Sequence, residues 1–174
     1  AAANSIYRLD VSSCANERIY YASRDKGDAF IISCYDSDPA PAEYNFYIKN
    51  DHDTKNLVIQ DIFTFSVDAD VQWIMWQVTG AAAGSAVLVP KCLNLTMEHT
   101  SHCTCYGGTS AVTGLTVVGT QLMSWFNGPA NNPLLRDFND TLIIGKGQAI
   151  AIEYEAGSTN AINICIKMFW EDHD

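Results

Sequence analysis

The chain has 174 residues, a length that fits one domain spanning 1–174, and its net charge is −10. This acidity disfavours a phosphate backbone as a partner. No apolar run approaches the roughly 20 residues that a membrane-spanning helix needs. We therefore expect no nucleic-acid partner and no membrane partner. Residues 1–4 and 171–174 are expected to be flexible. Charged residues make up only 17% of the chain, which favours a surface partly covered by neighbouring subunits.

Apolar and polar residues alternate with period two along much of the chain. Gly, Pro, Asn and Asp interrupt this pattern about every ten residues, which is typical of strands joined by turns. The first probable loop covers 36–43, where Pro39 and Pro41 disfavour regular pairing. The pattern predicts an all-β, single-domain protein, either a jelly roll or another β-sandwich, with the strand order left open.

The clearest strand runs from Leu57 to Val67. Alternation is broken at Asp61 and Ile62, which a bulge explains. The strand is expected to place these side chains on one face: Leu57, Ile59, Phe63, Phe65 and Val67. The turn-like segment 68–70 leads into 71–78, which predicts a hairpin.

Two later segments are predicted to be loops. Residues 80–84 carry two glycines around three alanines and are expected to be a flexible connection. Residues 127–140, rich in Asn and Pro, are expected to form the longest loop, with one helical turn around 133–138. Because loops of this length often lie at a contact, we expect this loop and residues 4–22 to touch other proteins.

The C-terminal part reads as two strands. Ile150, Ile152 and Tyr154 share one face of the first, with Ala149, Ala151, Glu153 and Glu155 on the other. The second is expected to point these side chains inward: Ile162, Ile164, Ile166, Met168 and Trp170. These strands are the best candidates for the core.

Sequence motifs for catalysis are missing. There is no phosphate-binding loop, no G-x-G-x-x-G and no G-x-S-x-G. We predict no catalytic residues, no cofactor and no enzymatic activity.

The strongest local group combines His99, His102, Cys103 and Cys105 with Cys92, a ligand set that zinc accepts. The spacing is not that of a zinc finger, so a strand with free thiols is preferred to a metal site. Paired acidic residues, as at Asp36 and Asp38, are read as solvated turns.

Aromatic residues admit two interpretations. Tyr20, Tyr21, Tyr44, Phe46 and Tyr47 could stack against a sugar. Together with the four tryptophans, they are more typical of a core or a subunit interface, and we favour the interface.

Several motifs follow one another along the chain: 45–50 followed by 54–59, then 89–95, then 142–152, and an aromatic-Glu ending at 169–171. In this order they resemble the motifs of small β-sandwich virion proteins of tailed bacteriophages. Val89, Cys92 and Lys146 depart from the pattern. The resemblance implies a head-decoration or tail-associated structural protein, often trimeric.

From this resemblance we expect a capsid decoration, or cement, protein located on the virion, on the capsid surface or the tail. It would form a homotrimer and bind the major capsid protein or another virion protein. The alternative is a carbohydrate- or receptor-binding jelly roll, as on a tail-fibre tip or a lectin. A metal-dependent, cupin-like enzyme is a third possibility.

Overall fold

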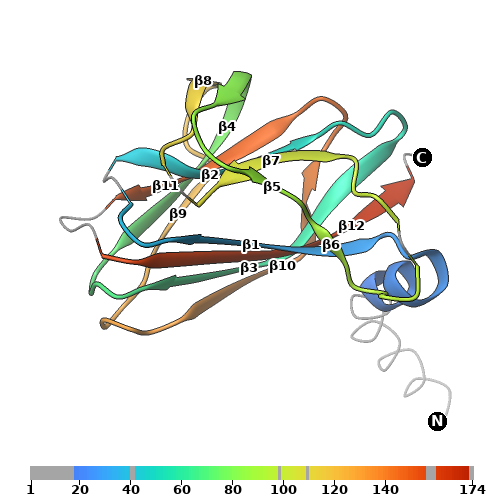
Figure 1. The fold of residues 1–174 in the computed structure, drawn as a ribbon, viewed down its shortest axis with the longest axis horizontal. Helices are drawn as coiled ribbons and strands as arrows, with labels where there is room; N and C mark the ends of the chain where they lie inside the picture. The colour runs from blue at the N-terminus through green and yellow to red at the C-terminus, as the bar shows by residue number, and fades with distance from the viewer. Residues whose placement is uncertain (1–17, 40–41, 98, 109, 156–159, 173–174) are drawn as a thin grey trace, which may run out of the picture.

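The computed structural model describes residues 18–39, 42–97, 99–108, 110–155 and 160–172. Two antiparallel sheets pack face to face (Figure 1). The first sheet holds, in spatial order, β10 (Leu134–Ile144), β3 (Lys55–Ser66), β12 (Ile162–Asp172), β1 (Ala29–Asp36) and β6 (Lys91–Cys92). The second holds β5 (Val87–Leu88), β7 (Cys103–Gly107), β2 (Glu43–Asn50), β11 (Ala149–Glu155), β4 (Gln72–Ala83) and β8 (Thr113–Val117), with β9 (Met123–Phe126) also paired to β4.

The strand pairing is that of a jelly roll. Counted from the two ends of the chain inward, β1 pairs with β12, β2 with β11 and β3 with β10. The innermost pair is β4 with β8 and β9. A long antiparallel hairpin wrapped around a barrel gives this order, which defines the jelly roll. The all-β prediction is confirmed, and the pairing identifies the kind of sandwich. The short strands β5 to β7 are an insertion between β4 and β8.

The core lies between the sheets and contains the faces predicted for the two C-terminal strands. Ile150, Ile152 and Tyr154 of β11 point into it. On β12 the predicted inward side chains are all buried: Ile162, Ile164, Ile166, Met168 and Trp170. Ala149 and Ala151, on the opposite face of β11, belong to a second apolar cluster on the outside of that sheet. The alternation of apolar and polar residues was enough to predict the core faces of β11 and β12, because neither strand contains an inserted residue that would exchange its two faces.

The predicted hairpin at 57–78 is wrong. β3 and β4 belong to different sheets, so the turn at 68–70 crosses from one layer to the other. Asp70 adopts a positive φ of 55° in this turn. The predicted flexible connection at 80–84 is also wrong for most of its length, since β4 continues to Ala83 and pairs with β8. Gly80 is required there, because a Cβ on it would lie 2.3 Å from the carbonyl oxygen of Gly114.

The predicted loop at 127–140 ends earlier than expected. β10 begins at Leu134 and pairs with β3, so the expected helical turn at 133–138 is a strand instead. Pairing with the long β3 overrides the local preference of the Pro- and Asn-rich sequence. At the C-terminus, Glu171 and Asp172 belong to β12 and form ion pairs, so the flexible tail expected at 171–174 is wrong for these two residues. Residues 173 and 174 lie outside the described residues.

One short helix precedes β1. It is α-helical over 18–21 and continues as η1 (Ala22–Lys26). In Figure 1 this 18–26 helix lies at the end of the sandwich where β12 ends. None of the described residues form a helix that is long and apolar enough to span a membrane.

Candidate interaction surface

A bulge in β3 reverses the two faces of this strand. Lys167 of β12 pairs with Asp61, but the next residue, Met168, pairs with Ile59, so Gln60 is inserted without a direct partner. An inserted residue shifts the alternation by one, because side chains alternate with period two. Beyond the bulge, Ile62, Thr64 and Ser66 are buried. The prediction that Phe63, Phe65 and Val67 share the core face of Leu57 is therefore wrong.

The consequence is an apolar outer face on the first sheet. Residues directly opposite each other in an antiparallel sheet point to the same side, so the register defines rows across the strands. The first row is Tyr35, Asn163 and Phe65. The second is Ser33, Cys165, Phe63 and Leu135. The third is Ile31, Lys167, Asp61 and Asp137. The fourth is Ala29, Phe169, Val58 and Ile143.

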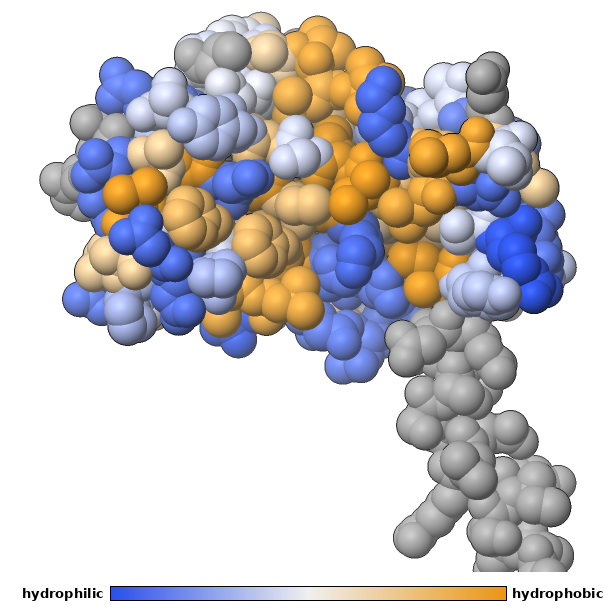
Figure 2. Space-filling model, turned by 60° about the horizontal axis from the view of Figure 1, so that its bottom comes forward, coloured by the Kyte–Doolittle hydropathy of each residue, from blue (hydrophilic) through white to orange (hydrophobic). Residues whose placement is uncertain are grey.

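Figure 2 shows apolar side chains gathered across the face of the molecule that it presents, with hydrophilic groups between them. Lys167 Nζ lies 3.0 Å from Asp61 Oδ2, so these two charges neutralise each other, while Asp137 adds one carboxylate at the β10 end of the third row. With strands about 4.8 Å apart, the first three rows cover about 400 Å², polar and charged side chains included. Exposed apolar side chains gathered on one face can mark an interaction site.

The neighbouring sheet edge is protected against pairing with another strand. β10 is the last strand of the sheet, and its register breaks between Asp137 and Leu142. Asn139 and Asp140 have positive φ angles of 47° and 60° within this break. Bulges on edge strands prevent a foreign strand from adding to the sheet. A partner would therefore contact the face of this sheet and not the edge at β10.

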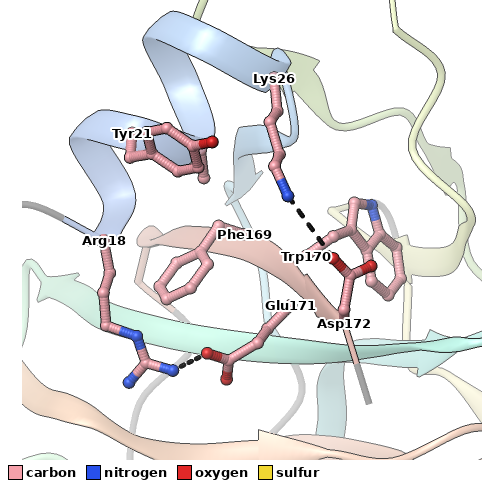
Figure 3. A pocket seen from close by; sticks show the side chains of 8 residues that line it. Arg18, Tyr21, Lys26, Phe169, Trp170, Glu171 and Asp172 are labelled. Carbon is pink, nitrogen blue, oxygen red and sulfur yellow. Dashed lines mark hydrogen bonds and ion pairs between the residues drawn. The ribbon is translucent and has the colours of Figure 1, made fainter. Parts of the chain in front are cut away.

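The 18–26 helix covers three of the four residues in the fourth row, while Ile143 is 48% exposed. Ala22 and Ile19 pack on Ala29, Val58 and Phe169. Between the helix and β12 there remains a hollow of about 270 Å³. Figure 3 shows the residues around it, with ion pairs joining the helix to the end of β12. Arg18 pairs with Glu171, and Lys26 Nζ lies 3.5 Å from Asp172 Oδ2.

The residues singled out as possible metal ligands do not form a metal site. His99 Nδ1 lies 3.3 Å from Asp28 Oδ1, at the base of the 18–26 helix. His102 lies against His52, with ring centroids 4.9 Å apart. Cys105 is buried in the core, and Cys103 packs against it. Among the residues that the structure describes, no group of three or more His, Cys, Asp or Glu side chains could hold a metal ion.

The described cysteines are free thiols, as predicted. Burial raises the pKa of Cys34 to about 12. A hydrogen bond with Cys103 and burial together raise the pKa of Cys105. Burial also raises the pKa of Cys165, on the outer face. The thiolate is the nucleophilic form, so these shifts disfavour a catalytic role for these three thiols.

The aromatic residues divide between the core and the surface. Trp73, Trp125 and Phe46 are buried in the core. Tyr20 and Tyr21 of the 18–26 helix are exposed. Sequence reasoning missed Phe63 and Phe65 as surface residues. The available signal was Asp61, a carboxylate interrupting an apolar strand, which marked the bulge without showing that the faces exchange after it.

His52 makes the β2–β3 turn sensitive to acid. Its Nδ1 accepts hydrogen bonds from the backbone N–H groups of Thr54 and Lys55, at 3.1 and 3.2 Å. Burial, followed by the neighbouring His102 and Lys55, lowers the pKa of His52 below the ordinary 6.5. A lowered folded-state pKa means that the unfolded chain binds the proton more readily. The contribution of His52 to the stability of the fold is therefore complete above pH 6.5, and it decreases as the pH drops toward the folded-state pKa.

We expect the urea concentration at the unfolding midpoint of the wild-type protein to decrease when the pH is lowered from 7.5 to 5.5. His52→Asn keeps a side-chain acceptor for the turn but removes the titrating ring, so its midpoint should fall less over the same interval. Equal slopes in the two proteins would show that His52 is not the sensor.

The comparisons with known proteins leave the family open. No family model matches the chain, and a search of curated proteins finds no match.

Proposed function

We propose that the protein is a non-enzymatic virion structural protein, a capsid decoration or cement protein that binds the assembled shell through the outer face of its first sheet. The observation that carries this proposal is the outward position of Phe63, Phe65 and Leu135 on the outer face of the first sheet. The ordered resemblance to phage virion proteins supports the same role. Jelly rolls recur in viral capsid domains, and also in lectins and cupins.

The size of the face favours a repeated contact. About 400 Å² is half of the roughly 800 Å² that each partner contributes to a standard interface. One copy would therefore bind weakly. Several copies joined in one oligomer, such as the predicted homotrimer, would bind an ordered lattice with avidity. A protein that binds only the assembled lattice stabilises the lattice by mass action.

The test uses intact particles and empty shells of the virus whose genome encodes the chain. Purified protein is mixed with them, sedimented and quantified in the pellet. We expect saturable binding and a higher melting temperature of the shell. Leu135→Glu, on the face and 57% exposed, should weaken binding at least tenfold, because it brings a carboxylate into each apolar contact.

Phe126→Glu is the matched control. Phe126 is 58% exposed and lies in β9, which belongs to the other sheet. The Phe126→Glu variant should bind particles and shells as tightly as the wild-type protein does. Failure of the wild-type protein to sediment with either particle, or equal losses in both variants, would refute the proposal. Sedimentation equilibrium measures the oligomer separately, with a homotrimer expected at three times the 19.1 kDa chain mass.

A second candidate is carbohydrate or receptor binding, as on a tail-fibre tip or a lectin. A hollow of about 190 Å³ on the second sheet is lined by Tyr44, Glu43 and Glu153, among others. Trp76 Nε1 donates a hydrogen bond to Glu153 Oε2 at 2.5 Å. Aromatic rings beside carboxylates suit a sugar ring with its hydroxyl groups. Glycan-array binding that is lost in Tyr44→Ala would favour this candidate over the shell.

A further inference from the structure

We propose that the 18–26 helix is a releasable cover on the outer face of the first sheet, which opens from its 18–22 half and uncovers Ala29, Val58 and Phe169 of the fourth row. Opening would extend the open face from three rows to four. The inference takes the sheet face as the binding surface and in this respect rests on the proposed function. The cover itself is a property of the chain alone and is testable without a shell.

The helix contributes little apolar surface to its contact, compared with the sheet residues that it covers. Val58 and Phe169 are on the outer face, yet they are at most 2% exposed. Ala22 is the one fully buried side chain that the described part of the helix contributes, and Ile19 is half-buried. An alanine side chain loses little hydrophobic stabilisation when it leaves such a contact. The sheet side of this contact is therefore much more apolar than the helix side.

The remaining attachment of the 18–22 half is electrostatic. Arg18 pairs with Glu171 of β12, and its Nη1 lies 4.0 Å from Oδ2 of Asp140 in β10. The guanidinium also lies over the ring of Phe169, 6.0 Å from its centroid. The side chains of Arg18 and Glu171 are 45% and 32% exposed, whereas that of Asp140 is 4% exposed. The pair of Arg18 with Glu171 therefore contributes little by itself and is screened by salt.

The contact between the helix and the end of β12 is open to solvent along one side. A hollow of about 270 Å³ lies there, lined by Arg18, Tyr21, Lys26 and Asp172, among others. Figure 3 shows these side chains around it. Solvent therefore reaches the side of the helix that carries its ion pairs.

The other end of the helix is anchored, which defines the direction of opening. Asn94 Nδ2 donates hydrogen bonds to the carbonyl oxygens of Ser23 and Arg24, at 3.0 and 3.2 Å. Gly27 follows in the left-handed region, with φ 66°, and Cys92 Sγ donates to its carbonyl oxygen at 3.2 Å. Residues 23–27 therefore stay in place when residues 18–22 lift.

A thiol at position 58 reports the opening directly. In Val58→Cys the new side chain points into the covered fourth row, so iodoacetamide reaches it only when the helix lifts. The native cysteines are separated from position 58 by peptide mass spectrometry. We expect 1 M NaCl to raise the labelling rate at position 58 several-fold, because the Debye length falls to about 3 Å. Glu171→Gln in this background should raise the rate roughly threefold.

Asp53→Asn in the same background is the matched control. It removes one exposed carboxylate that pairs with Lys146 and leaves the helix contacts intact, so the rate should not change. Should Val58→Cys fail to fold, amide hydrogen exchange of residues 20–22 in the chain with native Val58 gives the same comparison. Labelling or exchange that is insensitive to both salt and Glu171→Gln would overturn the cover.

The two proposals fail separately. A salt-independent cover combined with shell binding that Leu135→Glu weakens would overturn the cover and keep the proposed function. If salt releases the cover but the protein binds neither particles nor shells, the cover stands and the proposed function is overturned.

Discussion

Replacing Asn127 by alanine is expected to lower the free energy of unfolding by about 3 kcal/mol. Asn127 is buried, and its Oδ1 accepts hydrogen bonds from Trp73 Nε1 and Thr64 Oγ1 at 3.0 and 3.1 Å. Trp125 Nε1 donates in turn to Thr64 Oγ1 at 3.2 Å. Alanine would leave two buried donors without an acceptor. Each such donor loses its hydrogen bond without regaining one to water.

Urea unfolding followed by tryptophan fluorescence measures this loss. Asn132→Ala is the control, because Asn132 accepts a hydrogen bond from Asn127 Nδ2 through its backbone carbonyl, at 3.1 Å. That bond does not depend on the Asn132 side chain. The control should therefore stay near wild-type stability. A loss below 1 kcal/mol for Asn127→Ala would show that the network relaxes around the missing amide.

Gly107→Ala should cost about 2 kcal/mol or more through overpacking. A Cβ at this position would lie 2.7 Å from the carbonyl oxygen of Asn45 and 2.8 Å from Cys34 Sγ. The first atom is backbone of a buried strand, and the second is a buried thiol, so neither has room to move. The end of β7 would have to separate from β2 to accept a methyl group.

Gly128→Ala isolates the steric effect. Neither Gly107 nor Gly128 has a positive φ, and a Cβ on Gly128 would meet no atom within 4 Å. The two substitutions have the same effect on the unfolded chain, so their difference in melting temperature measures the contact alone. Equal melting temperatures would contradict the assigned packing.

Part of the fold could be predicted because local alternation and burial agree. In β12, every second residue from Ile162 is core-facing, and the pattern alone was sufficient. In β3 the same reasoning failed beyond Gln60, because one inserted residue exchanges the two faces. The sequence around Asp61 shows that the pattern is interrupted. Which half of the strand then faces the core depends on the register with β12, more than 100 residues away.

The predictions for the connections were wrong for the same reason: the outcome depends on strand partners that are distant in the sequence. A turn such as 68–70 looks alike whether the next strand returns in the same sheet or crosses to the other layer. The candidate surface combines both difficulties. Leu135 was assigned to a loop and Phe63 to the same face as Leu57, and the register places Phe63 and Leu135 side by side on the outer face. The ion-pair partners of Arg18 in the 18–26 helix come from β12 and β10, which no local pattern connects to the helix.

The position of β12 has a consequence for how the chain acquires its structure. β12 lies between β3 and β1 and hydrogen-bonds to both, so the centre of the first sheet is made of the last strand of the chain. Residues 29–36 and 55–66 cannot complete this sheet until residue 172 has been synthesised. Contacts so distant in sequence slow folding. During that interval the two strands have open edges and exposed apolar side chains, which makes the unfinished chain prone to aggregation.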